Sequence, residues 1–368
     1  MVTLTTFNIS DIHTNASRIP VADKCDSMDA VLTSNFLAQI DILFIAGDFF
    51  DHVMSLNHRE LPILMDWIFR LLVRCESAST KIRILEGTPL HDRKQSELFI
   101  TLANQLKKRP DIKYFKELDI EILDNGVSIF YIPDEYRPYP DLTLKELKTK
   151  MSEKSLSVVD IGIMHGFFAY QLPEIVAHAA HDFDEYSKIV KHYISIGHVH
   201  DMSKNGKVLA QGSWDADKFG DSQIKGGWLC TLDLEDAEND VFTFITNKLS
   251  HRYIDIPLDG LNLVEATEVV CNYMPFTERD HLRLVITDQE SENIAIALRS
   301  KFPDIDWHSK KKPVVEKQEV KRVVNKTVPI NETTIMGVVK TELESRNKTQ
   351  EQITSCLKEL ELYVDAVY

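Results

Sequence analysis

The sequence predicts an α+β fold, specifically an α/β sandwich in which stacked sheets are flanked by helices. Two observations support this prediction. In the first 250 residues or so, short apolar runs alternate with longer amphipathic stretches, and from about residue 120 the pattern becomes richer in strands. After His251 the alternation restarts on a smaller scale, which predicts a second, smaller domain.

The early alternation pairs each buried strand with a helix that follows it. We expect strands at 3–8, 42–46 and 82–85, and helices at 28–39, 63–75 and 96–107. Asp124-Asn125-Gly126 lies between two apolar runs within 120–133, and it predicts a hairpin because Asn and Gly tolerate positive φ. Further strands are expected at 158–164, 193–196, 208–211, 228–234 and 241–245.

The smaller domain is predicted to be a β-α-β-α-β unit. Its expected elements are 253–256, 263–273, 282–287, 292–302 and a strand around 304–307. The predicted organisation is therefore a main domain at 1–250, a small domain at 251–312, a basic linker at 313–330 and a helical tail at 331–368.

The last part of the sequence combines positive charge with amphipathic character. Residues 309–326 hold seven Lys or Arg against two Glu, a composition that suits phosphate tracking or simply a solvated connector. Within 332–364, apolar residues recur at intervals of three and four, which predicts an amphipathic helix. Such a helix either binds a partner or packs on its own domain.

Composition limits the classes of protein that this chain can be. At 368 residues and 43% hydrophobic it can bury a full core, and no apolar run approaches the ~18 residues of a membrane span, so a cytoplasmic protein is expected. The five scattered cysteines predict reduced thiols. A net charge of −15 argues against a free-standing nucleic-acid binder, although bound metals or a basic partner would weaken that objection.

Five groups of potential metal ligands occur in order, and four of them directly follow predicted strands. Asp11 and His13 come first, and alternate residues of an extended chain can face one metal. Asp48 follows the strand at 42–46, and its two oxygens could bridge two cations. Asp51 is interpreted as a helix N-cap or as an acceptor behind the ligands.

The remaining three groups complete the series. His91 lies in Gly-Thr-Pro-Leu-His-Asp after the strand at 82–85, where it could protonate a leaving oxygen, with Asp92 as a supporting acceptor. His165 closes the strand at 158–164. His198 and His200 follow the strand at 193–196, and they can serve two metals only if the backbone bends between them.

In this order the five motifs resemble the calcineurin-like metallophosphoesterase superfamily, whose signature is D-x-H, G-D-x-x-D, G-N-H-D, a strand-end H and G-H-x-H. The resemblance spans residues 11–200. It implies a fold, two divalent ions and a role for each matching residue. One ion would be held by Asp11, His13 and His200, and the other by His165 and His198. Asp48 would bind both ions, and His91 would be a catalytic residue that binds neither.

The third motif departs from the family pattern. The Asn that normally binds the second metal is missing, and Leu90, which precedes His91, cannot coordinate an ion. Thr88 offers only a neutral hydroxyl, and Pro89 restricts the loop. We therefore expect a weaker second metal site, and loss of activity is an open alternative.

Within the superfamily the chain most resembles SbcD-like DNA-repair nuclease subunits, in a divergent branch such as a phage-encoded one. The small domain resembles their capping domain, the tail resembles the region that grips a coiled-coil ATPase, and 209–214 resembles the stretch after G-H-x-H. This resemblance implies an Mn²⁺-dependent exonuclease and endonuclease that acts on DNA, binds an SMC-like, SbcC-type ATPase through about 331–368, and forms a homodimer.

Two other functions remain as alternatives. One is a stand-alone phosphodiesterase or phosphatase for small substrates, which the acidic composition favours. The other is a DNA-end-binding assembly subunit with weak activity, which the missing Asn favours.

Some further polar and aromatic residues are interpreted as structural. His178 and His181 lie near two aspartates, but no apolar strand delivers them, so they are expected on a helix surface. A group of aromatic residues beside the ligand motifs could contact bases or form a dry wall around the metals: Phe49, Phe50, Phe167, Phe168 and Tyr170.

Overall fold

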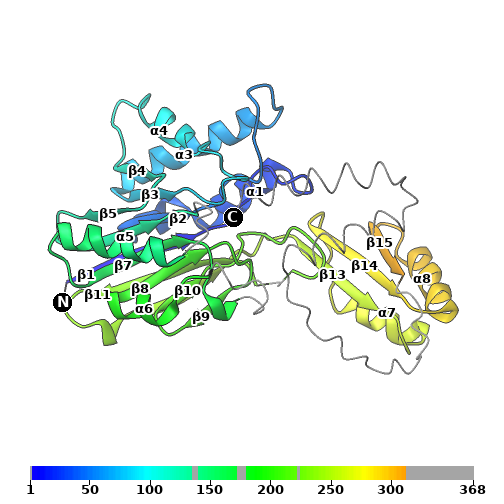
Figure 1. Cartoon of the computed structure of the whole chain (residues 1–368). Helices are drawn as coiled ribbons and strands as arrows, with labels where there is room; N and C mark the ends of the chain where they lie inside the picture. The colour runs from blue at the N-terminus through cyan, green and yellow to red at the C-terminus, as the bar shows by residue number, and fades with distance from the viewer. Residues whose placement is uncertain (1, 135–139, 172–179, 222–223, 312–368) are drawn as a thin grey trace, which may run out of the picture. The chain divides into compact units, whose positions relative to one another are not determined.

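The computed structural model describes residues 2–134, 140–171, 180–221 and 224–311. Residues 1–312 form one compact unit. Its main part contains two large mixed sheets (Figure 1). The first has six strands in the order β12 (Val241–Thr246), β11 (Gly226–Asp233), β1 (Thr3–Ile9), β2 (Ile42–Ala46), β3 (Lys81–Leu85) and β4 (Ile112–Phe115).

The second sheet also has six strands. Their order is β5 (Asp119–Ile122), β6 (Ser128–Ile132), β7 (Val159–His165), β8 (Val190–Gly197), β10 (Val208–Ala210) and β9 (Ser203–Asn205). Strands β1 to β4 are mutually parallel, and so are β6, β7, β8 and β10. Each sheet therefore gathers the carboxyl ends of several strands at one edge.

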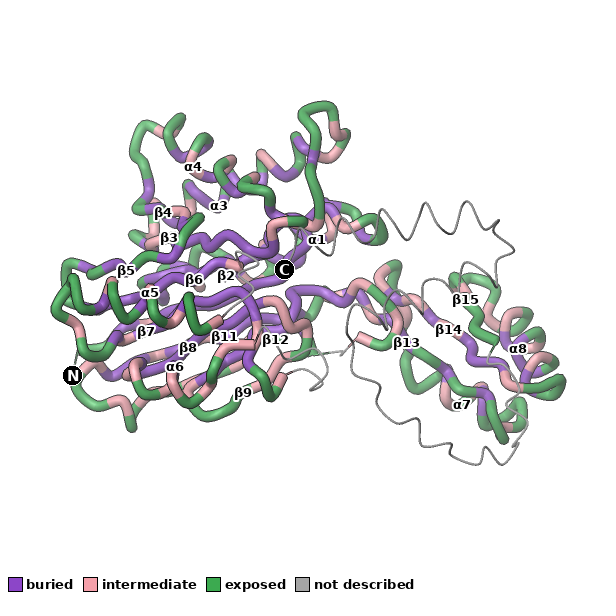
Figure 2. Tube along the Cα trace, viewed as in Figure 1, coloured by how far each residue is buried: buried purple, intermediate pink, exposed green. Residues whose placement is uncertain are grey.

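The two sheets pack face to face through an apolar layer. Phe44 on β2 and Tyr131 on β6 belong to this layer, together with Leu4, Ile161 and Tyr193. Every residue of β2 is buried, because its inner face meets the second sheet and its outer face meets helices (Figure 2). This double burial explains why the strand is a continuous apolar run in the sequence.

Helices cover the outer faces of both sheets. A large cluster with Trp67 and Phe99 joins the first sheet to the helices on its side, which are α1 (Val21–Val31), α2 (Ser34–Leu37), α3 (Leu61–Ala78) and α4 (Glu97–Ala103). A second cluster, with Leu147 and Tyr186, joins the other sheet to α5 (Pro140–Glu153) and α6 (Phe183–Ile189). The result is the predicted α+β sandwich.

Most elements expected from the sequence are present, with ends shifted by a few residues. The hairpin is confirmed: Leu123 N–H donates to the Val127 carbonyl at 2.8 Å, and Gly126 has φ +86°. The single helix expected at 28–39 is wrong. Two helices occur there, because the hydroxyl of Thr33 accepts the Phe36 N–H at 3.2 Å and so begins a new helix. Strand β4 and helix α5 were not expected.

The small sheet is formed by three parallel strands, β13 (Arg252–Pro257), β14 (Asp280–Ile286) and β15 (Trp307–Lys311), with α7 (Leu263–Cys271) and α8 (Gln289–Lys301) between them. The β-α-β-α-β order is as expected, although the last strand begins at Trp307 instead of around 304. The sheet has its own apolar core, which includes Ile256, Leu284 and Leu298.

A buried carboxylate fixes the start of the small sheet. Asp215 accepts the backbone N–H of His251 at 2.7 Å, and its other oxygen lies 3.2 Å from the His251 ring nitrogen Nδ1. The expected domain boundary near residue 250 falls at this contact and stays a prediction. The predicted linker at 313–330 and tail at 331–368 lie outside the described residues.

Two findings concern the predictions about membrane spans and about the cysteine thiols. Among the described helices, none combines the length and apolar character needed to cross a bilayer. Within the described ranges, Cys25, Cys75 and Cys230 are buried free thiols and Cys271 is an exposed one.

Candidate metal centre

All seven residues that the sequence predicted as ligands or catalytic groups lie at the carboxyl ends of parallel strands. Asp11 and His13 follow β1, Asp48 follows β2 and His91 follows β3 in the first sheet. His165 ends β7, and the pair at 198 and 200 follows β8 in the second sheet. Loops at such edges are held by the rigid strands below them. Two sheets thus contribute to one site.

The loops adopt unusual backbone conformations at the ligands themselves. Asp11, His13, Asp48 and His198 all have positive φ, between 48° and 95°. This region is unfavourable for residues with a Cβ, so the surrounding contacts must hold it in place. The Asp48 carbonyl does so by accepting the N–H groups of both Ile12 and His13, at 2.9 and 3.1 Å. For His198, the positive φ supplies the bend that two imidazoles at i and i+2 require.

Close packing of the loops explains the glycines that precede the ligands. A Cβ at Gly47, where φ is +89°, would lie 2.3 Å from Nδ1 of His165. A Cβ at Gly87 would lie 2.1 Å from the backbone nitrogen of Asp48. Any larger residue would push the ligands apart.

The first cluster consists of Asp11, His13 and His200, whose ligand atoms lie within 4.8 Å of one another. The Nε2 atoms of the two histidines are 3.3 Å apart, and Asp11 Oδ1 is 3.8 Å from that of His200. Two imidazole lone pairs and a carboxylate directed at one point suit a divalent cation. Asp11 is oriented from behind by the Ser10 hydroxyl and by the backbone N–H of His198.

The second cluster consists of Asp48, His165 and His198, with the same 4.8 Å spacing. His165 is fully enclosed, and its Nδ1 lies 2.8 Å from the Ala46 carbonyl. Because a carbonyl only accepts, Nδ1 carries a proton, so Nε2, 3.2 Å from Asp48 Oδ2, is the ring atom that could coordinate a cation. This arrangement pre-sets the tautomer that a metal ligand needs.

Burial and mutual attraction shift the pKa values of these groups. Burial by itself lowers the pKa of His165, but the adjacent Asp48 carboxylate outweighs it and raises the pKa to about 10. The same pairing outweighs burial at Asp48 and lowers the pKa of that carboxyl group. Burial lowers the pKa values of His198 and His200. A bound cation would replace the proton on His165 as the partner of Asp48.

Thr88 occupies a central place in the second cluster. Its hydroxyl lies 3.0 Å from Asp48 Oδ2 and 3.4 Å from ring nitrogens of both His165 and His198. The two inserted residues, Pro89 and Leu90, form a turn beyond it, closed by the His91 N–H on the Thr88 carbonyl at 2.8 Å. The Thr88 hydroxyl therefore lies among the candidate ligand side chains of the second cluster. Because a neutral hydroxyl is a poor ligand, a weak second site stays our prediction.

His91 lies beside the first cluster, and with His13 and Asp51 it forms a further group whose ligand atoms lie within 4.8 Å of one another. Its ring centroid is 5.0 Å from that of His13, and its side chain remains 35% exposed. Its Nδ1 is in short contact with the Asp51 carbonyl, so Nδ1 bears the proton and Nε2 is available to exchange a second one. This is the placement expected of a proton donor at the mouth of the site.

The two supporting aspartates act in different ways. Asp51 is not a helix N-cap, because α3 begins at Leu61; its carboxylate instead lies 3.2 Å from His13 Nδ1. Asp92 is buried and accepts the N–H groups of Phe50 and Gly87, which ties the second and third loops together. Burial, with the Asp48 charge nearby, raises the pKa of Asp92 to about 7.

Two contributors to the site were missed. Ser10 orients Asp11, and Lys225 donates its ammonium to the His200 carbonyl at 3.1 Å and to the Ser213 hydroxyl at 2.7 Å. The proximity of Ser10 to Asp11 could have suggested its role. Lys225 is distant in the sequence and has no local signature, so only the fold identifies it.

The histidine and aromatic interpretations are partly corrected. His181 is not on a helix surface: it precedes α6, is mostly buried, and packs against Phe168 and Tyr186. His178 lies outside the described residues. Three aromatics, Phe49, Phe50 and Phe168, are core residues. Their burial favours the interpretation that they form a dry wall around the candidate metal centre. Phe167, stacked on His198, and the partly exposed Tyr170 remain able to meet a substrate.

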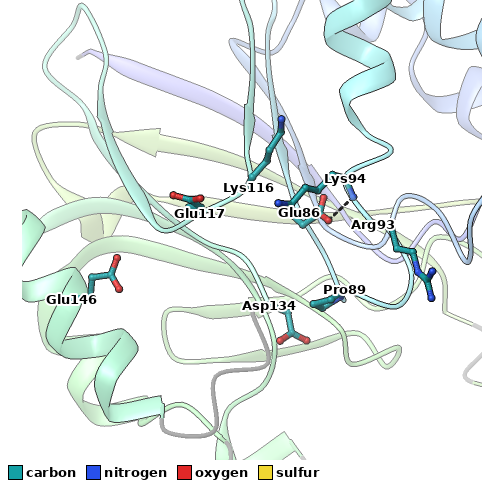
Figure 3. Close-up of a pocket in the computed structure, with 8 residues that line it drawn as sticks. All are labelled: Glu86, Pro89, Arg93, Lys94, Lys116, Glu117, Asp134 and Glu146. Atoms are coloured by element: carbon teal, nitrogen blue, oxygen red, sulfur yellow. Dashed lines mark hydrogen bonds between the residues drawn. The ribbon is translucent and has the colours of Figure 1, made fainter.

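A cleft of about 650 Å³ opens beside the third loop, next to Pro89 (Figure 3). Arg93, Lys94 and Lys116 contribute positive charge to it, while Glu86, Glu117, Asp134 and Glu146 contribute negative charge. Glu86 is held by the Lys94 N–H at 2.7 Å. The cleft is therefore of mixed charge and not a uniformly basic channel.

Comparisons with known proteins give no family assignment. No protein-family model matches the sequence, and no curated protein is significantly similar. Among solved structures, TT1561 of Thermus thermophilus aligns with 66% of this chain and 99% of its own, at 10% identity and a TM-score of 0.39. GAP50, the anchor in the inner membrane complex of Plasmodium, aligns with 78% and 98%, at 12% identity and 0.40. These values are too low to support an assignment.

Proposed function

We propose that the chain is a metal-dependent phosphodiesterase with a metallophosphoesterase fold, and that it acts as the nuclease subunit of a DNA-repair complex. One observation carries the proposal: two clusters, each with one carboxylate and two imidazoles, lie at the strand ends of two facing sheets. Adjacent metal sites of this composition are suited to phosphoryl chemistry. The order of the motifs along the chain adds to this support.

The residues fit two divalent ions. Asp11, His13 and His200 would hold one ion, His165 and His198 would hold the other, and Asp48 would contribute to both. Asp48 is suited to this role because the charges of His165 and His13 outweigh the effect of burial and lower its pKa. When bound, two such ions supply an activated hydroxide and stabilise charge on the phosphoryl oxygens. Oxygen and imidazole donors make Mn²⁺ the preferred candidate.

In this proposal a side chain of the protein, His91, protonates the leaving group. Nδ1 of His91 is anchored by the Asp51 carbonyl, and the side chain is partly exposed, so Nε2 is free to meet a substrate oxygen. A protonated His91 can therefore donate to the departing 3′ or 5′ oxygen without changing its orientation. Proton donors of this kind contribute roughly 10²–10⁴-fold to rate.

The direct test is Mn²⁺-dependent hydrolysis of linear DNA and of bis-p-nitrophenyl phosphate by the full chain. His91→Ala should lower both rates by roughly 10²–10⁴-fold while leaving bound manganese unchanged. His52→Ala is the matched control, because His52 also contacts Asp51 but is half-exposed and belongs to neither cluster. It should retain activity. Equal loss in both variants, or no loss in His91→Ala, would contradict the assigned role.

The DNA substrate and the protein partners rest on resemblance. We propose that the chain acts on DNA ends, forms a homodimer and binds an SbcC-type coiled-coil ATPase through about 331–368. Deleting residues 331–368 should abolish co-elution with such an ATPase and leave hydrolysis of the small ester unchanged. Retained co-elution would remove this partner assignment. Sedimentation of the full chain tests the dimer.

Two observations favour the alternative functions. The net charge of −15 and the mixed charge of the cleft beside Pro89 favour a stand-alone enzyme for small phosphodiesters. The presence of Thr88 among the ligands favours a weakly active DNA-end-binding subunit. Hydrolysis of the small ester alone would support the first. DNA binding without hydrolysis of either substrate would support the second.

A further inference from the structure

The small sheet carries a further group of side chains with metal-ligand spacing, which is separate from the centre described above. One face of this sheet is covered by α7 and α8 and supplies Ile254 and Leu282 to the small core (Figure 1). Because side chains alternate along a strand, His281 on β14 and His308 on β15 belong to the opposite face. That face has no helix over it among the described elements.

Three residues on this face converge. His281, Asp306 and His308, here called the small-sheet triad, place one ligand atom each within 4.8 Å of one another. Asp306 Oδ2 is 3.7 Å from His308 Nε2. Asp306 directly precedes β15, so Asp306-Trp307-His308 repeats the D-x-H spacing of Asp11-Ile12-His13. In both places, alternate residues direct a carboxylate and an imidazole towards the same side.

A second observation concerns the ring of His281. Nε2 of His281 is buried, yet it makes no hydrogen bond within the described part of the chain. A buried polar nitrogen without a partner is unfavourable, so such atoms usually have a function or a bound species. The nearby cation Arg283 does not meet this need, because it is engaged with Asp255 at 2.6 and 2.8 Å.

Aromatic contacts hold the imidazoles in place. The Tyr253 ring stacks on His281 with centroids 4.4 Å apart and an interplanar angle of 17°. Phe219 meets the His308 ring edge-on at 5.3 Å. Rings fixed in this way lose less entropy when they bind a ligand, which favours a preformed site.

We propose that the small-sheet triad is a zinc-class metal site that joins strand β15 to strand β14. Two imidazoles and one carboxylate are a donor set for Zn²⁺, with water in the fourth position. The ion would bridge His281 on one strand to Asp306 and His308 on or beside the next, and so stabilise the edge of the sheet. The triad shares no residue with the two-cluster centre, so this proposal does not depend on the proposed function.

The test measures bound zinc directly. The full chain is freed of metal with a chelator and dialysed against Zn²⁺, and the zinc bound per chain is counted by mass spectrometry. Asp306→Asn and His308→Ala should each bind one equivalent fewer than the wild type. Asp304→Asn is the matched control, because it removes the same charge two residues earlier from an exposed position outside the triad. It should bind as much zinc as the wild type.

The same comparison in a background of Asp48→Asn and His198→Ala separates the triad from the main centre. If that background is folded by circular dichroism, it should still bind one equivalent that His308→Ala removes. Addition of Co²⁺ should also give tetrahedral d–d absorption that is lost with His308→Ala. Unchanged zinc content in Asp306→Asn and His308→Ala, or equal loss in Asp304→Asn, would overturn the proposal.

Discussion

The main centre and the small-sheet triad both contain a D-x-H pair, but the backbone beneath the two pairs differs. Asp11 and His13 lie on a loop with positive φ and are surrounded by buried hydrogen-bond partners. His308 lies in a regular strand of a sheet with one face that no described helix covers. The strain of the first site is maintained by contacts from neighbouring loops, whereas the second site requires no special backbone. Under the two proposals, backbone strain accompanies the centre proposed for reaction chemistry, whereas a regular strand suffices for the proposed structural ion.

The largest expected effect comes from removing the carboxylate of the second cluster. Asp48→Asn should lower Mn²⁺-dependent hydrolysis of bis-p-nitrophenyl phosphate by on the order of 10³-fold or more, because it removes a charged ligand from the site of charge development. The control Asp66→Asn changes an exposed aspartate on α3 and should leave the rate unchanged. A rate within a few-fold of the wild type in Asp48→Asn would show that the clusters do not perform this chemistry.

The role of close packing is tested by two glycines with nearly the same φ. Gly47→Ala would bring a Cβ to 2.3 Å from the His165 ring, whereas the space around a Cβ at Gly126 is empty to 4 Å. Both variants incur the cost of positive φ, about 1–2 kcal/mol. Gly47→Ala should lower the free energy of unfolding by about 1–3 kcal/mol more than Gly126→Ala does, because overpacking destabilises the folded state. Urea unfolding of both variants measures the difference, and equal stabilities would mean that the loop adjusts freely.

The half-buried His181, which lies outside the main centre and the small-sheet triad, extends the comparison. Burial lowers the pKa of His181 to about 4 from an ordinary 6.5. As the pH falls below 6.5, the unfolded chain takes up this proton before the folded chain does, so stability is lost between pH 6.5 and 4. The expected loss from pH 7.5 to 5.0 is about 2 kcal/mol. His181→Phe should reduce the pH dependence of urea unfolding by that amount, and an unchanged slope would contradict it.

The smallest effect concerns the hydroxyl among the ligands of the second cluster. Thr88→Val keeps the shape but removes the oxygen, and should weaken the second Mn²⁺ by roughly 10-fold; Thr88→Asn restores an amide oxygen and should strengthen it by a similar factor. Manganese titration followed by electron paramagnetic resonance separates the two ions. If neither variant changes the second binding constant, Thr88 is only a packing residue.

Several features of the site could be predicted because they are local. Four of the five ligand motifs directly follow a predicted apolar strand in the sequence, and the carboxyl ends of parallel strands meet at one edge. The bend at His198 was required by the spacing of His198 and His200. For Asp51 the sequence left two roles open, and of these only the acceptor role is compatible with the structure, because no helix begins there and its carboxylate lies 3.2 Å from His13 Nδ1. The prediction of a single helix at 28–39 was wrong because the hydroxyl of Thr33 caps a new helix there, which the apolar periodicity does not reveal.

The sequence by itself determined the order of the strands and ligand motifs along the chain, the hairpin at Asn125-Gly126 and the β-α-β-α-β pattern of the small sheet. These features depend on residues that are neighbours in the chain. Only the tertiary structure decided that Thr88 lies among the ligands, that Lys225 supports His200, and that His281 meets Asp306 and His308. These contacts join residues that are distant in the sequence. Sheet pairing and loop packing bring them together, and no local propensity records that.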